Sequence, residues 1–515
     1  MKTLKGIWNT TIDKYGDLTA VKWLEKKEIK EITYAGVNEL VKATRNGLAN
    51  DGFHHVHIAL IGTSSVWWIS SFLGIVTGDN TAVPLDAGLP TEELIDLLNR
   101  SDSEAVFLDE KHQSMTDTIK KECPLIRKIY ILGERKFNIT IPVEIKSPQP
   151  TDIATIIYTS GTTGKSKGVM LTQENMAENV NAVEYEATPG CQVMSVLPIH
   201  HAYCLVMDWL KTMSLGCTIS INDSFMHMVR NMGIFKPEVM LMVPLMIETI
   251  YKKVRVAEET ALLDKFGTTD VSEMVKDAVR KSLHEKVFGG KLRTIFTGGA
   301  HLEPYYIDKF AEYGVGIYEG YGMSECSPVI SNNTLDDNKP GSIGKPLKNI
   351  EIKFEDGEIL VRGSSVMQGY YKMPEETAKV LTDGWLHTGD KGYIDEDGYL
   401  FINGRVKNLI IMSNGENVSP EEIENKLALN TLIQEIIITG ENNGLVARIF
   451  PDEDATKDMS KVEIESKLQQ VIDDYNSNQP SYKHITGLVI RSTPFIRNAT
   501  GKIKRQEATL ENEAV

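Results

Sequence analysis

The sequence feature that most constrains the fold is a glycine-rich loop directly after an apolar strand. Residues 154–158 read Ala-Thr-Ile-Ile-Tyr, and residues 159–168 read Thr-Ser-Gly-Thr-Thr-Gly-Lys-Ser-Lys-Gly. Glycines let main-chain N–H groups turn toward a ligand, while hydroxyls and lysines add hydrogen-bond donors and positive charge. We therefore predict that this loop binds a polyphosphate. The candidate contacts are Thr159, Ser160, Gly161, Thr162, Thr163, Gly164, Lys165 and Lys167.

The loop differs from the P-loop of nucleoside triphosphatases. That motif requires a glycine five residues before its Gly-Lys-Ser/Thr ending. Gly164, Lys165 and Ser166 match the ending, but position 159 is Thr159. The spacing therefore disfavours a P-loop, and a solvated hairpin is the remaining structural alternative for the loop taken alone.

Strand and helix patterns alternate through the first two thirds of the chain. Short apolar runs at 57–62, 81–85 and 105–109 predict strands, with a helix at 67–76 and another opening at Pro90. This alternation predicts a mainly parallel sheet covered by helices. A second α/β stretch covers about 152–326, residues 341–403 predict a small barrel or meander, and about 404–515 has strands and helices of its own. The predicted fold is α/β, with two parallel-sheet subdomains, a small β-barrel and a small α+β C-terminal domain.

Charge and cysteine usage narrow the classes of partner. The formal charge is −16, from 55 basic and 71 acidic side chains, which disfavours nucleic acid and anionic membrane surfaces but not a nucleotide in a local pocket. The five cysteines form no CxxC pair, so we expect reduced thiols. No apolar leader is evident, and the run from Val66 to Val76 is too short to span a membrane. We expect a cytoplasmic protein with no integral membrane segment.

Four further motifs follow the loop in order. Gly298-Gly299-Ala300 comes after an apolar strand, and 318–325 reads Tyr-Glu-Gly-Tyr-Gly-Met-Ser-Glu. Residues 383–390 read Asp-Gly-Trp-Leu-His-Thr-Gly-Asp, followed by Gly404-Arg405, and 497–505 reads Arg-Asn-Ala-Thr-Gly-Lys-Ile-Lys-Arg. Taken with the loop, these motifs resemble the adenylate-forming superfamily of acyl-CoA synthetases, peptide-synthetase adenylation domains and firefly luciferase. The 383–390 motif is most similar to that of fatty acyl-CoA synthetases.

The resemblance implies roles for the nucleotide-site residues. Tyr321 would stack on adenine, Ser324 would reach the α-phosphate, and Glu325 would hold Mg²⁺ through a hard carboxylate oxygen. Asp390 would accept the ribose hydroxyls, and Arg405 would make a second contact to ribose or phosphate. The same resemblance implies an adenine-side surface made of Gly299, Ala300, Glu319, Gly320 and Gly322.

It also implies a mobile C-terminal domain. Residues 1–403 would form the N-terminal domain, 404–408 a hinge pivoting at Lys407, and 409–515 the C-terminal domain. Lys502 would bridge the attacking carboxylate and the α-phosphate, neutralising charge in the transition state. After rotation at the hinge, the loop containing Gly415 would reach the tunnel for the thiol.

The implied activity is an ATP-dependent acid–thiol ligase that works through an acyl-AMP intermediate and releases pyrophosphate. Its substrates would be a carboxylic acid, ATP with Mg²⁺, and coenzyme A. The fatty acid–CoA ligase is the leading hypothesis. The alternatives are a ligase that loads a free-standing acyl carrier protein, an aryl-acid CoA ligase and a non-catalytic nucleotide-binding relative.

The acid-binding side is marked by residues 198–203, Pro-Ile-His-His-Ala-Tyr, which resemble the family motif in which a His or aromatic lines the acyl pocket. Its offset from Pro198 favours His201 over His200. The acidic motif of amino-acid-activating relatives is missing here, which disfavours an amino acid substrate. Nine of the 19 methionines lie between Met194 and Met246, and they indicate either adaptable core packing or a deformable channel for an alkyl chain.

Overall fold

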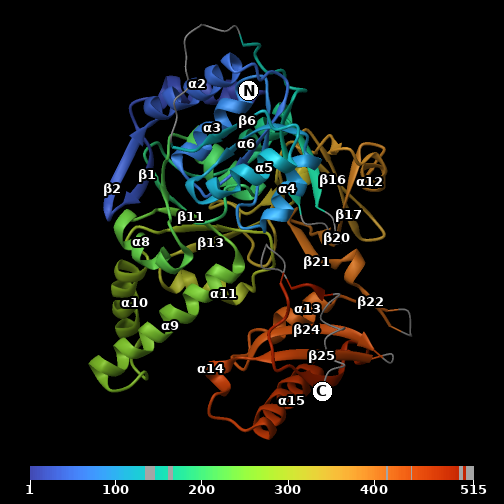
Figure 1. Ribbon diagram of the computed structural model, residues 1–515. Coiled ribbons are helices and arrows are strands. Elements are labelled where there is room, and N and C mark those ends of the chain that lie inside the picture. The colour runs from blue at the N-terminus through green and yellow to red at the C-terminus, as the bar shows by residue number, and fades with distance from the viewer. Residues whose placement is uncertain (134–144, 160–165, 413–415, 442–443, 498–502, 506–515) are drawn as a thin grey trace. The chain divides into compact units, whose positions relative to one another are not determined.

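The computed structural model describes residues 1–133, 145–159, 166–412, 416–441, 444–497 and 503–505. The chain forms two compact units (Figure 1). Unit 1 contains Met1–Ile352, Val361–Leu386 and Glu396–Leu400, and unit 2 contains Lys353–Leu360, His387–Asp395 and Phe401–Val515. None of the helices in these described ranges has the length and apolarity needed to cross a membrane.

The first sheet of unit 1 has seven strands in the order β18-β8-β7-β4-β3-β5-β6. The strands from β7 to β6 pair in parallel, while β7–β8 and β8–β18 pair in antiparallel fashion. Helices α3 (Val66–Val76) and α4 (Thr91–Arg100) connect its parallel strands, and Pro90 is the N-cap of α4. The strands are β3 (His57–Ile61), β4 (Thr81–Leu85), β5 (Ser103–Leu108), β6 (Lys128–Ile131), β7 (Ile153–Thr159), β8 (Lys167–Thr172) and β18 (Gly369–Tyr370).

The second sheet of unit 1 has nine strands in the order β15-β14-β13-β12-β11-β9-β10-β1-β2. Its central pairs, from β13 to β1, are parallel, and its two ends are closed by antiparallel strands. The strands are β1 (Thr19–Glu25), β2 (Glu28–Thr33), β9 (Gln192–Ser195), β10 (Thr218–Ile221), β11 (Val239–Met242), β12 (Thr294–Thr297), β13 (Gly316–Gly322), β14 (Val329–Asn332) and β15 (Lys345–Pro346). The two predicted parallel-sheet subdomains are thus confirmed.

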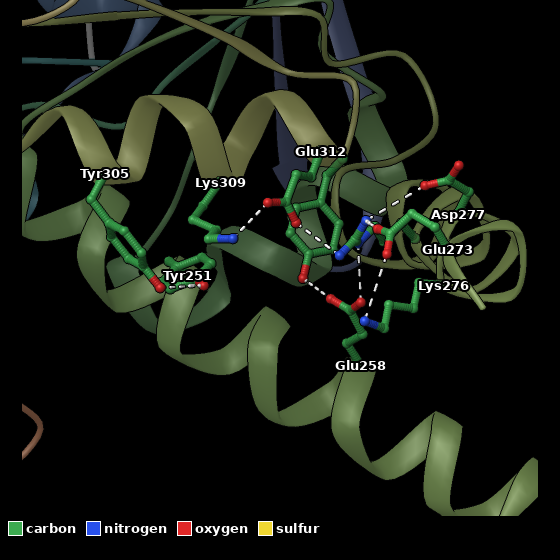
Figure 2. A network of polar contacts seen from close by, with 10 residues as sticks. Tyr251, Glu258, Glu273, Lys276, Asp277, Tyr305, Lys309 and Glu312 are labelled. Carbon is green, nitrogen blue, oxygen red and sulfur yellow. Dashed lines mark hydrogen bonds and ion pairs between the residues drawn. The ribbon is translucent and has the colours of Figure 1, made fainter. Parts of the chain in front are cut away.

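Three helices of unit 1 are connected by the largely buried side chain of one arginine, Arg280. Figure 1 shows α9 (Pro244–Phe266) and α10 (Glu273–Val287), in green, extending away from the strands, with α11 (Pro304–Glu312) beside them. Arg280 of α10 binds Glu258 of α9 at 3.0 Å and Glu312 of α11 at 2.8 Å, and it also binds Glu273 at 2.7 Å. Figure 2 shows these carboxylates converging from three helices. Because Arg280 is only 12 % exposed, this network fixes the helices relative to one another.

The methionine-rich segment serves mainly as core. Met194, Met228, Met232, Met240 and Met242 are buried in one hydrophobic cluster, which includes residues of α8 (Met228–Phe235), β11 and α9. Met226, in contrast, is exposed. The packing explanation therefore accounts for most of this segment.

The expected small barrel is a curled five-stranded sheet. Its strand order is β16-β17-β20-β19, with β21 paired to β20. The division between the two units passes through it, since β17 and β20 each contribute residues to both units. The strands are β16 (Ile350–Glu355), β17 (Glu358–Gly363), β19 (Leu381–Thr382), β20 (Trp385–Ile394) and β21 (Leu400–Arg405).

The C-terminal part of unit 2 is the predicted small α+β domain. It has a three-stranded sheet of β24 (Ile433–Glu441), β25 (Gly444–Pro451) and β26 (Ile485–Ile490), in which β24–β25 is antiparallel and β25–β26 parallel. Helices α13 (Pro420–Leu427) and α15 (Lys461–Ser477) bury apolar side chains against this sheet. The predicted α/β fold class is confirmed with this arrangement.

Candidate active site

The predicted phosphate loop joins two strands of the seven-stranded sheet. Thr159 ends β7 and Lys167 begins β8, and their Cα atoms are partners in the antiparallel ladder. Ser160, Gly161, Thr162, Thr163, Gly164 and Lys165 lie outside the described residues. On the described side, the guanidinium of Arg100 donates a hydrogen bond to the main-chain oxygen of Ser166. Arg100 therefore anchors the chain where the loop returns to the sheet.

Lys167 is paired with a carboxylate that the sequence motifs did not identify. Its Nζ lies 2.6 Å from Glu376 Oε2 and 4.9 Å from the centre of the Tyr370 ring. Hydrogen bonds from Lys167 and then Lys379 lower the pKa of Glu376 to about 2. Lys167, a predicted phosphate contact, is thus already paired with the Glu376 carboxylate, which would compete with a phosphate for the same ammonium group.

Glu325, the predicted Mg²⁺ ligand, lies where the two sheets of unit 1 meet. It belongs to a single 3-10 turn, Ser324–Cys326, that follows β13, and it is 9 % exposed. Tyr370 of β18 donates its hydroxyl to Glu325 Oε1 at 2.8 Å, and burial followed by this carboxylate raises the pKa of Tyr370. The hydrogen bond sets the orientation of the carboxylate. Within the described ranges no group of three or more His, Cys, Asp and Glu side chains could hold a metal, so a Mg²⁺ ion at Glu325 would need phosphate oxygens as further ligands.

The predicted adenine side is built from two neighbouring parallel strands. Thr297 at the end of β12 is the partner of Glu319 in β13. The turn after β12 carries Gly299, with φ +82°, and Ala300, and both are exposed. A Cβ atom on Gly322 would lie 1.9 Å from the main-chain oxygen of Pro328, so no larger residue fits there.

The remaining residues of that motif differ in their exposure. Tyr321 is buried, and Gly320 lies beside it in β13. Glu319 is also buried and accepts a hydrogen bond from Gly341 N at 3.2 Å; burial raises its pKa to about 7. Glu319 is therefore a carboxyl that changes protonation near neutral pH beside the predicted adenine site.

On the predicted acyl side, the two histidines have different surroundings. Their ring centres are 4.2 Å apart, and His200 Nε2 lies 3.7 Å from Asp86 Oδ1. Burial and then His201 lower the pKa of His200 to about 4, so it is neutral at physiological pH. The preference for His201 as the pocket residue stays a prediction.

The helix that follows His201 is buried along its whole length. It is a π-helix, Cys204–Lys211, in which all eight side chains are buried. Burial raises the pKa of Asp208 to about 7, and Lys211 donates to Val180 O at 2.9 Å. The sequence motifs gave no sign of Asp208, which is the one acidic residue of this helix.

Unit 2 brings the predicted ribose contacts together. The side chain of Asp390 in β20 is 7 % exposed, while that of Arg405 at the end of β21 is 52 % exposed, and Arg405 Nε lies 3.0 Å from Asp390 Oδ1. The Asp390 main-chain N donates to Thr388 Oγ1 at 3.1 Å, which stabilises the backbone of β20 at Asp390. The acceptor-only carboxylate and its guanidinium are thus already ordered by their own contacts.

Of the other predicted C-terminal residues, the structure describes Lys407. Lys407 lies exposed in a short 3-10 turn, Val406–Asn408, inside unit 2. Gly415 and Lys502 lie outside the described residues. The hinge, the domain limits and the assigned roles of all these residues stay predictions.

Comparison with known protein families covers nearly the whole chain. The model described as "AMP-binding enzyme" matches residues 8–371, and the model described as "AMP-binding enzyme C-terminal domain" matches residues 407–514.

Curated relatives include ligases of long-chain fatty acids. The "Long-chain-fatty-acid--CoA ligase FadD15" of Mycobacterium bovis is 27 % identical over 463 residues, covering 82 % of this chain and 77 % of that protein. The chloroplastic "Long-chain-fatty-acid--[acyl-carrier-protein] ligase AEE15" of Arabidopsis thaliana is 26 % identical over 590 residues, covering 92 % of this chain and 80 % of that protein.

Solved structures share the fold at low sequence identity. The anthranilate CoA ligase AuaEII in complex with anthranoyl-AMP has a TM-score of 0.82 at 20 % identity, covering 99 % of this chain and 96 % of that one. The o-succinylbenzoate CoA synthetase MenE of Bacillus subtilis, with ATP and a magnesium ion, has a TM-score of 0.78 at 22 % identity, covering 98 % and 99 %. Family models spanning both units, joined to the motif residues described above, show that the chain belongs to the AMP-binding enzyme family and is an AMP-forming acid–thiol ligase.

Proposed function

We propose that the protein is a fatty acid–CoA ligase. In the first step, a fatty carboxylate oxygen bonds to the α-phosphorus of MgATP, the bond to the β-phosphate oxygen breaks, and pyrophosphate leaves. In the second step, the CoA sulfur bonds to the acyl carbon, the thiol loses its proton, and AMP leaves.

The observation that carries the choice of acid is the buried helix after His201. All eight side chains of Cys204–Lys211 are buried; burial raises the pKa of Asp208 to about 7, and Lys211 donates to Val180 O. We place the acyl pocket beside this helix because the helix follows His201, and its mostly apolar side chains would suit an uncharged alkyl tail better than a substrate with an ammonium group. The long-chain fatty acid ligases among the relatives support the same choice.

The chemistry of the first step requires charge neutralisation, because two anions must approach each other. Glu325, oriented by Tyr370, supplies a hard oxygen for Mg²⁺. Lys167 and Lys502 supply positive charge, and Asp390 accepts from the ribose hydroxyls.

Rotation at Lys407 then replaces Lys502 by the loop containing Gly415 and admits the thiol. This part of the proposal is tested by Lys502→Ala. The variant should lose acyl-AMP formation but largely keep thioester formation from supplied acyl-AMP. Equal loss of both half-reactions would contradict it.

An acyl carrier protein is the second candidate acceptor, because one relative is a long-chain fatty acid–acyl-carrier-protein ligase. The formal charge of −16 disfavours docking of an acidic carrier, which is why CoA is preferred. We also propose a cytoplasmic location. It is supported by the five cysteines, which are all buried and form no disulfide bonds.

The function is tested by carboxylate-dependent exchange of labelled pyrophosphate into ATP, measured with C8–C18 fatty acids, benzoate, cinnamate and amino acids. Fatty acids should give the highest kcat/KM. Faster exchange with an aryl acid would overturn the substrate assignment, and no exchange with any acid would favour a non-catalytic relative. CoA and holo-acyl carrier protein, offered in competition, then identify the acceptor.

A further inference from the structure

The chain on both sides of residues 498–502 is joined into a short stem. Arg497 and Ile503 form an isolated antiparallel bridge, and Lys504 N donates to Ile496 O at 2.8 Å. Phe495 is buried against Ile437 of β24, and Ile503 packs on both. The stem is therefore seated on one strand of the C-terminal sheet.

One carboxylate of β24 clamps the first strand of the stem. Glu435 is 8 % exposed, and its Oε1 accepts from Arg497 Nε at 3.1 Å and from Nη2 at 2.7 Å. Its Oε2 accepts from the main-chain N of Phe495 at 2.6 Å. Both oxygens of a single buried side chain are thus used to hold two residues just before the segment 498–502. Hydrogen bonds of this kind, with a charged acceptor, are about twice as strong as neutral ones.

A second carboxylate clamps the other strand. Arg505 forms an ion pair with Glu424 of α13 and donates from Nη1 to Ile438 O at 3.3 Å. Glu424 Oε1 in turn accepts from Ile438 N at 2.6 Å. Each strand of the stem therefore ends in an arginine, and each arginine is bound by a buried glutamate that also bonds to main-chain N–H groups.

We propose that Glu435 and Glu424 are positioning residues for the adenylation step, because they fix the base of the segment that carries Lys502. The inference rests on the proposed function, in which that lysine meets the carboxylate and the α-phosphate. A shift of about 1 Å in a group that neutralises charge in the transition state can cost on the order of 100-fold in rate. In the proposed function the thiol-transfer step uses the loop that contains Gly415 in place of Lys502, so it should not depend on the stem.

The test compares the two half-reactions in Glu435→Gln. A Gln side chain cannot accept from Arg497 and Phe495 N together without turning its own amide N–H₂ toward one of them. We expect kcat for pyrophosphate exchange to fall roughly 10- to 100-fold. The KM values for acid and ATP should change by less than about threefold, and thioester formation from supplied acyl-AMP by less than about twofold.

A matched control exists in the same sheet. Glu441 of β24 binds Arg448 of β25 at 2.6 Å, and within the described residues this pair makes no hydrogen bond to the stem. Glu441→Gln removes another Glu–Arg ion pair of the same sheet, with a more exposed carboxylate, and should leave both half-reactions at the wild-type level. Arg497→Lys keeps the charge and loses the two-pronged geometry, so it should give an intermediate exchange rate, and it replaces Glu435→Gln if that variant does not fold.

The outcomes separate the inference from the function it rests on. If the wild-type protein showed no pyrophosphate exchange with any acid, the proposed function would be refuted, whereas the contacts that form the stem would still hold. Wild-type exchange together with unchanged exchange in Glu435→Gln would overturn the inference. Equal loss of both half-reactions, or equal loss in Glu435→Gln and Glu441→Gln, would mean general destabilisation and would overturn it as well.

Discussion

Asp208 should make the stability of unit 1 depend on pH. The side chain is fully buried in the π-helix Cys204–Lys211, and its Oδ1 has no hydrogen-bond partner in the described structure. Burial raises its pKa from 3.8 to about 7, although Ser195 and Cys204 oppose the shift through hydrogen bonds. The folded protein therefore holds a proton that the unfolded chain releases at lower pH.

The sign and size of the effect follow from this difference. Below pH 3.8 both states are protonated, and the full stability is present. Between pH 3.8 and about 7 the Asp208 carboxyl is ionised in the unfolded chain but protonated in the folded protein, so the free energy of unfolding falls as pH rises. Folding raises the pKa of Asp208 by about 3 pH units, and each unit corresponds to about 1.4 kcal/mol. The free energy of unfolding is therefore lower by about 4 kcal/mol once the pH exceeds the folded-state pKa. From pH 5 to pH 8 the loss should be about 2–3 kcal/mol.

Asp208→Asn removes this titration while keeping the shape of the side chain. The variant should gain about 2–3 kcal/mol relative to the wild type between pH 5 and pH 8. Urea unfolding at fixed ionic strength measures it, followed by tryptophan fluorescence, because all six tryptophans lie in unit 1. Asp264→Asn, on the exposed surface of α9, is the control and should show no such trend. A constant difference between wild type and Asp208→Asn across this pH range would refute the reasoning.

Three further outcomes are expected. Tyr370→Phe removes the hydrogen bond that orients Glu325, so half-maximal pyrophosphate exchange should need about tenfold more Mg²⁺. Glu376→Gln releases Lys167 from its ion pair, so the KM for ATP should fall about threefold at low salt and return toward the wild-type value at high salt. Arg280→Met leaves the partly buried carboxylates of Glu258 and Glu312 without their shared partner, and it should lower the free energy of unfolding by about 1–2 kcal/mol while the KM for ATP stays unchanged.

Each of these has a neighbouring control. Tyr393→Phe, an exposed tyrosine, should leave the Mg²⁺ dependence unchanged, and Glu375→Gln, beside Glu376, should leave the KM for ATP unchanged. Arg255→Met, on the exposed side of α9, should alter stability by less than about 0.5 kcal/mol. A higher KM for ATP in Glu376→Gln would show that the ion pair helps Lys167 reach the phosphate instead of competing with it.

Much of the fold was predictable because its signals are local. The apolar runs that form β3, β4, β5, β7 and β12 are short, buried on both faces and bounded by helices or turns. Periodicity and breakers identify such strands within a few residues. Asp390 and Arg405 could be paired from the motifs that carry them, and the structure places them 3.0 Å apart.

The missed residues have partners that are far away in sequence. Tyr370 is 45 residues from Glu325, and Glu376 is 209 residues from Lys167. Both contacts depend on the pairing of β18 with β8. The strand Gly369–Tyr370 has only two residues, so its sequence does not predict that pairing. Asp208 was missed for a different reason: an acidic residue in a helix is normally solvent-exposed, and its burial depends on how the helix packs.

The β1–β2 hairpin at one end of the nine-stranded sheet has a consequence for solubility. β10 would otherwise be the outermost strand, and its Thr-Ile-Ser-Ile sequence is buried throughout. The hairpin covers it, and the new border strand β2 carries Glu28, Lys30 and Glu31. Charged side chains along a border strand discourage a second molecule from adding its own strand there. The β1–β2 hairpin thus protects β10 from strand addition by a second molecule, and its removal should make the protein aggregate more readily.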